Sequence, residues 1–163
     1  MATEVVIALG TNLGDRITNL REAVRLLGAE GVTVTRQSSV WETAPVPAEQ
    51  PAFLNAVLVG ETDLEPHDLL AALKRIEYAM GRRPGRRWGP RQIDLDILFY
   101  GALSLDVPNL RIPHERIAER SFVLAPLADV VTGPLPVLGK SAIELSDATG
   151  REGLELTELT LDS

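Results

Sequence analysis

The alternation of apolar and polar positions along the chain predicts four strands and two helices. Short apolar runs between turn residues are typical of buried strands. They lie at residues 4–10, 32–35 with a continuation towards Trp41, 53–61 and 92–100. Apolar residues at helical spacing predict helices over residues 17–27 and 66–80, and a glycine follows each. Gly10 and Gly14 are expected to form the turn after the first strand.

The order of these elements is strand, helix, strand, strand, helix, strand. This order is typical of an α+β ferredoxin-like βαββαβ sandwich, in which helices cover one face of a mainly antiparallel sheet. We expect one domain over residues 1–163, because the chain has no repeat, low-complexity tract or linker. A short helix is predicted near residues 114–120. Residues 133–163 have the composition of an acidic, solvated extension without recognisable chemistry.

Composition narrows the classes of function. The 163 residues contain no cysteine, which excludes thiolate catalysis, Cys-ligated zinc and iron–sulfur chemistry. Two histidines are too few for a His-rich metal site. No apolar run approaches the ~20 residues of a membrane span, and the first residues lack the pattern of a signal peptide. We therefore expect a cytoplasmic protein with no membrane partner.

Charge is unevenly distributed along the chain. The net charge of −7 argues against a protein that binds nucleic acid through its overall charge. Residues 74–91 nevertheless carry seven basic side chains and one acid, Glu77, so their local charge is +6. Such a cluster indicates either a site for a polyanion or a basic loop paired with the acidic remainder of the chain.

Two acidic residues follow this basic cluster. Asp94 and Asp96 are two positions apart on a predicted strand, so their side chains point to one face, ~7 Å apart along it. Neighbouring carboxylates repel each other unless a cation lies between them, and oxygen ligands favour Mg²⁺. Arginines bind phosphate oxygens in bidentate fashion. The two aspartates and the neighbouring arginines together indicate a phosphoryl-transfer site, with arginine–aspartate salt bridges as the alternative.

Four blocks of the sequence resemble the 6-hydroxymethyl-7,8-dihydropterin pyrophosphokinases of folate biosynthesis. The blocks occur in family order across about residues 5–127. They are Leu9-Gly10-Thr11-Asn12-Leu13-Gly14, Gln50-Pro51-Ala52-Phe53-Leu54-Asn55, Arg87-Trp88-Gly89-Pro90-Arg91-Gln92-Ile93-Asp94-Leu95-Asp96, and Ile112-Pro113-His114 with Arg120-Ser121-Phe122. The resemblance implies transfer of pyrophosphate from ATP, the co-substrate, to the pterin hydroxymethyl group, with release of AMP.

The resemblance also implies roles for individual residues and two Mg²⁺ ions. Both ions would be held by Asp94 and Asp96, and we hypothesise that Mg²⁺ and Asp94 activate the hydroxyl group. The implied catalytic residues are Arg82, Arg91, Asp94 and Asp96. The implied ATP contacts are Lys74, Arg82, Arg83, Arg91, Ile97, His114 and Arg120. The implied pterin contacts are Thr43, Ala44, Pro45, Val46, Phe53, Asn55, Trp88 and Phe122.

The chain departs from the family pattern at two places. Pro84 occupies the position of a family arginine, for which Arg83 or Arg86 would substitute. Asn109 stands where some relatives have an arginine, and Arg111 follows two residues later.

Two other classes of function compete with this interpretation. A ferredoxin-like RNA-binding module would use the arginines as its footprint, but it needs exposed aromatic residues on the central strands, and residues 5–9 contain none. A non-catalytic small-ligand sensor would explain a pocket but not the aligned Asp94 and Asp96. We expect a monomer that acts on ATP and a pterin, without nucleic acid.

Overall fold

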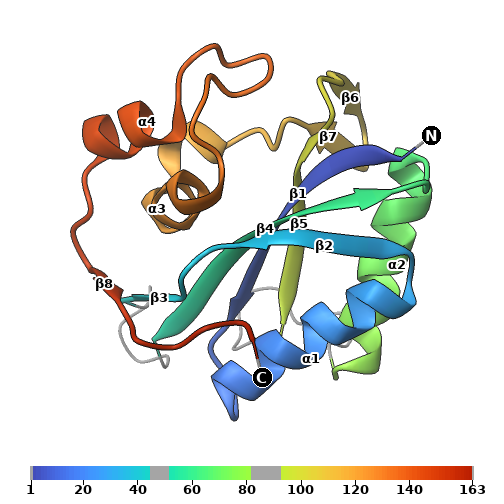
Figure 1. The fold of residues 1–163 in the computed structure, drawn as a ribbon, viewed down its shortest axis with the longest axis horizontal. Helices are drawn as coiled ribbons and strands as arrows, with labels where there is room; N and C mark the ends of the chain where they lie inside the picture. The colour runs from blue at the N-terminus through green and yellow to red at the C-terminus, as the bar shows by residue number, and fades with distance from the viewer. Residues whose placement is uncertain (1, 45–51, 82–92, 163) are drawn as a thin grey trace.

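The computed structural model describes residues 2–44, 52–81 and 93–162. Within these ranges, a six-stranded antiparallel sheet forms the centre of the fold (Figure 1). Its strand order is β5-β1-β4-β3-β8, and β2 pairs with β4 on the same side as β3. The strands are β1 (Thr3–Thr11), β2 (Val32–Gln37), β3 (Trp41–Thr43), β4 (Phe53–Thr62), β5 (Asp94–Tyr100) and β8 (Leu154–Leu156). The short strands β6 (Leu105–Val107) and β7 (Leu110–Ile112) form a separate hairpin.

The order of β1, α1, β2, β4, α2 and β5 confirms the predicted ferredoxin-like arrangement. The second predicted strand is divided into β2 and β3, which both pair with β4. Ser38 lies at the interruption, where its hydroxyl accepts the N–H of Val57 at 2.8 Å. A side chain therefore takes the place of a backbone acceptor, and pairing with β4 resumes beyond it as β3.

Helices α1 (Arg16–Ala29) and α2 (Pro66–Ala79) cover one face of the sheet (Figure 1). Asp15 begins α1 by accepting the N–H of Thr18, and Pro66 occupies the first turn of α2, where a missing N–H costs little. Apolar residues at helical spacing contact the sheet from both helices. The fully buried ones include Leu20, Ala23, Leu27, Leu69 and Leu73. Each buried leucine contributes roughly 1.5–3 kcal/mol.

A second helical layer, α3 (Ser121–Val130) and α4 (Ala142–Thr149), covers the opposite face of the sheet. The sequence predicted helices on one face only. It also predicted a short helix near residues 114–120, where the structure has a 3₁₀ helix, Ile117–Glu119, and the α-helix begins only at Ser121. The reason is burial, because Val123, Leu124 and Leu127 pack on the sheet and draw the helix to the later residues.

The acidic C-terminal residues are packed against the rest of the fold. β8 pairs with β3, and Leu161 is buried in the core under α1 and α2. The Arg21 guanidinium donates to the carbonyl oxygen of Thr160 at 3.1 Å. The expected solvated extension therefore adds a strand to the sheet while its acidic side chains remain exposed. Within the described ranges, no helix combines the length and apolar character needed to cross a membrane.

Gly60 provides a test of packing between β2 and β4. A Cβ atom there would lie 2.8 Å from Cγ1 of Val32 and 2.9 Å from the carbonyl oxygen of Thr33. We expect Gly60→Ala to lower the free energy of unfolding by about 1–3 kcal/mol, because the strands have to separate. Urea denaturation measures the change. Gly133→Ala, which meets no atom within 4 Å, is the control and should stay within about 0.5 kcal/mol of wild type.

Candidate active site

Asp94 and Asp96 lie on one face of β5, as the sequence predicted. The intervening Leu95 and the following Ile97 are buried against α1 and α2, so the two carboxylates point to the opposite face. β5 is the edge strand beside β1, with Asp94 opposite Gly10 and Asp96 opposite Ala8. The sheet therefore fixes the backbone of both aspartates on one side.

An irregularity in β5 places His114 beside the aspartates. The register between β1 and β5 shifts between Val6 and Ile7, so Leu98 has no counterpart in the ladder. The carbonyl oxygen of Leu98 instead accepts the N–H of His114 at 3.2 Å. The bulge thus attaches the chain at His114 to β5, two residues beyond Asp96.

A cavity of about 760 Å³ opens over the face that carries the aspartates. Five of the predicted pterin residues line it: Thr43, Ala44, Phe53, Asn55 and Phe122. Asp94, Asp96 and Arg120 also line it. Phe53 and Phe122 are half-buried and face this cavity, which separates them from ordinary core residues. Pro45, Val46 and Trp88 lie outside the described residues.

Asn55 is held in one orientation at the floor of this cavity. It is 6% exposed, and its Nδ2 donates to Oγ1 of Thr43 at 2.5 Å. Gly10 lies opposite Asn55 in the sheet, where a Cβ would be 3.0 Å from Oδ1. Gly10 is therefore a strand residue that permits this close approach, and its predicted role in the following turn is wrong.

A second cavity of about 370 Å³ lies on the other side of Asp96. Three of the predicted ATP residues line it: Lys74, Ile97 and His114. Asn109 and Arg111 line it as well, and Arg111 is paired with Asp106 and Glu115. Arg120 lines the first cavity instead, with its guanidinium 5.8 Å from the ring centre of Phe122. Arg82, Arg83 and Arg91 lie outside the described residues.

Asp96 lines both cavities. Among the described residues, those that the sequence assigned to the pterin line the first cavity, and those assigned to ATP line the second, with the exception of Arg120. The Asp96 carboxylate is common to both cavities. Such an arrangement allows two ligands to meet at Asp96.

Burial lowers the pKa of the His114 imidazole below its ordinary value, although the negative charge of Asp96 opposes this shift. The neutral ring accepts the N–H of Arg116 at Nδ1, at 3.4 Å. Its proton is therefore on Nε2, which makes that nitrogen a hydrogen-bond donor.

Sequence reasoning missed Glu77 as a structural part of the site. Glu77 is 2% exposed, and its Oε2 accepts the N–H of Leu95 at 2.8 Å, between the two aspartates. Its Oε1 lies 3.4 Å from Nζ of Lys74. A signal was present, because Glu77 falls on the buried stripe of α2 with Leu69, Leu73 and Ile76. An acid on an apolar stripe indicates a buried hydrogen bond.

Other residues of the first cavity were also missed as site residues. They are Ala8, Leu9, Gly10, Ala56, Arg116, Glu119, Ser121, Val123, Glu152 and Gly153. Leu9, Gly10 and Ser121 belong to the family-like blocks but were not assigned to a ligand. Glu152 and Gly153 belong to the C-terminal extension, and no sequence pattern connects them with a site.

The donor set of Asp94 and Asp96 fits Mg²⁺. Both are carboxylates on the wall of one cavity, and Mg²⁺ takes oxygen ligands from one or two carboxylates together with substrate phosphates and water. In the part of the chain that the structure describes, no group of three or more His, Cys, Asp or Glu residues could enclose a metal ion.

The fold and the site define a ferredoxin-like α+β protein with two adjoining small-molecule cavities. The family model for 7,8-dihydro-6-hydroxymethylpterin-pyrophosphokinase (HPPK) matches residues 6–132. The chain belongs to this family, and the resemblance found in the sequence is confirmed.

Relatives of two kinds are similar to the chain. The 2-amino-4-hydroxy-6-hydroxymethyldihydropteridine pyrophosphokinase of Pseudomonas aeruginosa is 41% identical, with 95% of this chain and 97% of the relative covered. The enzyme of the same name from Bacillus subtilis is 49% identical, with 76% and 75% covered. The mitochondrial folate synthesis bifunctional protein of Arabidopsis thaliana is 58% identical over 78% of this chain. The chain spans only 23% of that relative's length.

A solved structure supports the assignment of the fold. The HPPK-DHPS protein of Plasmodium falciparum, crystallised with pteroate, matches with a TM-score of 0.76 at 16% identity. The match covers 96% of this chain and 46% of that one. At this identity the likeness establishes the ferredoxin-like fold alone.

The state of His114 can be measured by NMR. We expect its ring protons to titrate below about 6.5, because burial disfavours the imidazolium. Protonation as the pH falls below that value then favours the unfolded chain, so stability is lost in that direction. His114→Gln identifies the signal by its disappearance. A midpoint at or above the ordinary value would contradict the buried, neutral ring.

Proposed function

We propose that this chain transfers the pyrophosphoryl group of ATP to the hydroxymethyl group of 6-hydroxymethyl-7,8-dihydropterin, giving AMP and the pterin diphosphate. Membership of the HPPK family supports this reaction. The observation that carries the proposal is that Asp96 lines both cavities. A nucleotide in the second cavity and a pterin in the first would meet there.

The first cavity has the chemistry that a pterin requires. Phe53 and Phe122 line it and offer aromatic faces for a flat heteroaromatic ring. The Asn55 amide offers a donor and an acceptor to the ring's own amide edge. Thr43 holds that amide by a 2.5 Å hydrogen bond, so it is oriented before the ligand binds.

The second cavity has the chemistry that a nucleotide requires. Lys74 supplies positive charge, Ile97 an apolar surface, and His114 a hydrogen-bond donor at Nε2. Arg120 extends the positive charge into the first cavity, where the transferred phosphates would lie. We propose that Arg82, Arg83 and Arg91, with Pro45, Val46 and Trp88 for the pterin, complete the site from outside the described residues.

Asp94 and Asp96 would hold two Mg²⁺ ions, which supply neutralisation of phosphate charge and in-line alignment of the two substrates when bound. The pterin hydroxyl oxygen forms the new bond to the β-phosphorus, and the bond between that phosphorus and the oxygen of AMP breaks. The hydroxyl proton moves towards Asp94, which lines the pterin cavity. The expectations of a monomer, a cytoplasmic location and no nucleic-acid partner stay predictions.

The reaction is tested by incubating the protein with ATP, Mg²⁺ and 6-hydroxymethyl-7,8-dihydropterin and measuring AMP and pterin diphosphate by chromatography. We expect pterin-dependent AMP that EDTA abolishes. Asp94→Asn should lower kcat by a factor of about 10²–10³, because charge neutralisation at the phosphates is lost. Lys140→Ala, on an exposed turn outside both cavities, should leave turnover unchanged. Turnover of Asp94→Asn within a fewfold of wild type would contradict the role of Asp94.

The assignment of the pterin to the first cavity and of ATP to the second is tested by steady-state kinetics on two variants. Asn55→Ala should raise KM for the pterin about tenfold or more with little change in KM for ATP, because a buried amide that holds one ligand is lost. Lys74→Met should raise KM for ATP and leave KM for the pterin within about twofold. If both variants raised both KM values equally, the two-cavity assignment would be wrong.

A further inference from the structure

The C-terminal residues form part of the wall of the first cavity. Residues 151–157, which contain β8 and are called here the β8 segment, run beside β3 (Figure 1). Glu152 and Gly153 line the cavity together with Thr43 and Ala44. The family model ends at residue 132, so this segment lies outside the matched region.

Backbone contacts connect residues 153–157 of the β8 segment to β3 and to the residues on either side of β3. Trp41, Glu42 and Thr43 pair with Leu156, Glu155 and Leu154. The N–H of Ala44 donates to the carbonyl oxygen of Gly153 at 2.9 Å, and the N–H of Thr157 donates to that of Val40 at 3.0 Å. β3 has only three residues, so these contacts on its outer side contribute much of its order.

β3 in turn determines where the Asn55 amide lies. Thr43 accepts the Asn55 Nδ2–H at 2.5 Å, and Trp41 stands opposite Asn55 in the sheet. A displacement of β3 would therefore move the Thr43 hydroxyl and release the amide. The effect of the β8 segment is transmitted to the cavity floor through one strand and one hydrogen bond.

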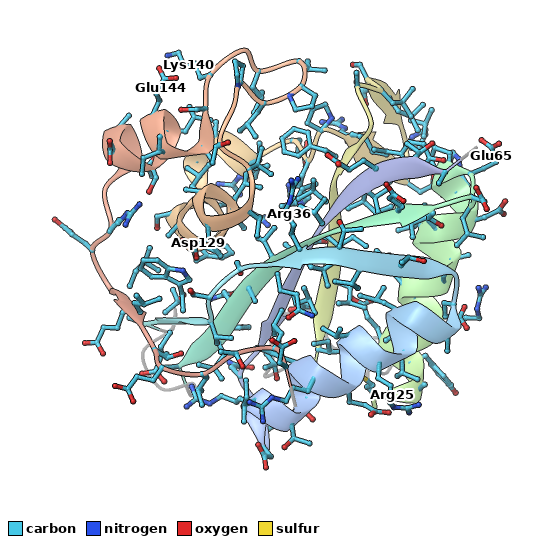
Figure 2. The ribbon with its side chains drawn as sticks, viewed as in Figure 1. Arg25, Arg36, Glu65, Asp129, Lys140 and Glu144 are labelled. Atoms are coloured by element: carbon cyan, nitrogen blue, oxygen red, sulfur yellow. The ribbon has the colours of Figure 1, made fainter. Side chains whose placement is uncertain are left out.

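Three side-chain contacts hold Arg151, at the start of the β8 segment, and Trp41 of β3 in place. The Arg151 guanidinium lies 5.4 Å from the ring centre of Trp41, and its Nε donates to Oγ of Ser146 at 3.0 Å. Trp41 is fixed from α3, because its Nε1 donates to Oδ2 of Asp129 at 3.1 Å. Figure 2 shows Asp129 on α3, on the side of the helix that faces β3. Arg151 is thus attached to α4 and Trp41 to α3, so both partners of the Arg151–Trp41 contact are held by the second helical layer.

We propose that the β8 segment is a positioning element for the pterin half of the site, which holds Thr43, and through it Asn55, in the geometry that binds the ring. The inference rests on the proposed function, because it takes the first cavity as the pterin cavity. Its effect is confined to one substrate, since none of its residues lines the second cavity.

Two glycines provide a matched test. Gly153 has φ of 78°, and a Cβ there would lie 3.4 Å from Cβ of Ala44. Gly139 has φ of 74°, and a Cβ there would meet no atom within 4 Å. Lys140, the residue after Gly139, lies near the start of α4, on the side away from β8 (Figure 2). Both changes to alanine strain the backbone to a similar extent because both residues have positive φ, but only in Gly153→Ala does the strain fall in the wall of the cavity.

We expect Gly153→Ala to raise both KM and Kd for the pterin about fivefold relative to Gly139→Ala, with KM for ATP unchanged. Calorimetry with 6-hydroxymethylpterin gives Kd without turnover. Equal pterin affinities in the two variants would overturn the positioning role. An inactive wild type that binds no pterin would instead overturn the proposed function.

Hydrogen exchange tests the contact without any ligand. The Ala44 amide of the wild-type protein should exchange slowly and should exchange faster in Gly153→Ala than in Gly139→Ala, because its acceptor is the Gly153 carbonyl. Exchange of that amide at the rate of an unstructured chain in the wild-type protein would overturn the inference even if Gly153→Ala failed to fold.

Discussion

The placement of two like charges on one edge strand is the constraint on which the rest of the site depends. Among the residues that the structure describes, β5 pairs with one strand, β1, on one side. Its other side presents the N–H of Leu95, which the buried Glu77 carboxylate accepts at 2.8 Å. A buried carboxylate is costly unless it is paired, and Glu77 is also within 3.4 Å of Lys74. Glu77 of α2 therefore connects the backbone of Leu95, between the two aspartates, to Lys74 in the second cavity.

The two helical layers contribute different halves of the site. α2 contributes Lys74 to the second cavity, and the start of α3 contributes Phe122 to the first. β5 lies between them with one face towards each layer, because its side chains alternate. The bulge at Leu98 interrupts this alternation, so Leu98 and Phe99 both pack on the α3 side. An edge strand with this bulge can thus display Asp96 where both cavities meet, which a central strand paired on both sides would not allow as readily.

The apolar pattern predicted the βαββαβ core because α1 and α2 bury one face at a clear helical period, and β1 and β4 are continuous apolar runs that are buried on both faces. It failed where elements lack that contrast. α3 is apolar on most sides, and β8, with the sequence Leu154-Glu155-Leu156, is too short to distinguish from a loop. Phe53 and Phe122 could not be separated from core residues by composition, and only the family resemblance suggested that they line a cavity. The sequence did give a partial signal for Glu77 and Gly10. An acid on an apolar helix stripe and a glycine within an apolar run are both unusual, so each indicates a special structural role.

The position of Arg120 follows from the same geometry. The family resemblance implies a nucleotide contact, yet Arg120 lines the first cavity rather than the second. These two statements agree if ATP extends from the second cavity past Asp96, because the phosphates to be transferred then enter the first cavity. On the proposed function, Arg120 at the start of α3 would then meet the transferred phosphates, and Lys74 and His114, which line the second cavity, would lie nearer the nucleoside. Positive charge on both sides of Asp96 would hold the reacting phosphorus near the hydroxyl group, and a single basic cluster on one side would draw the triphosphate away from it.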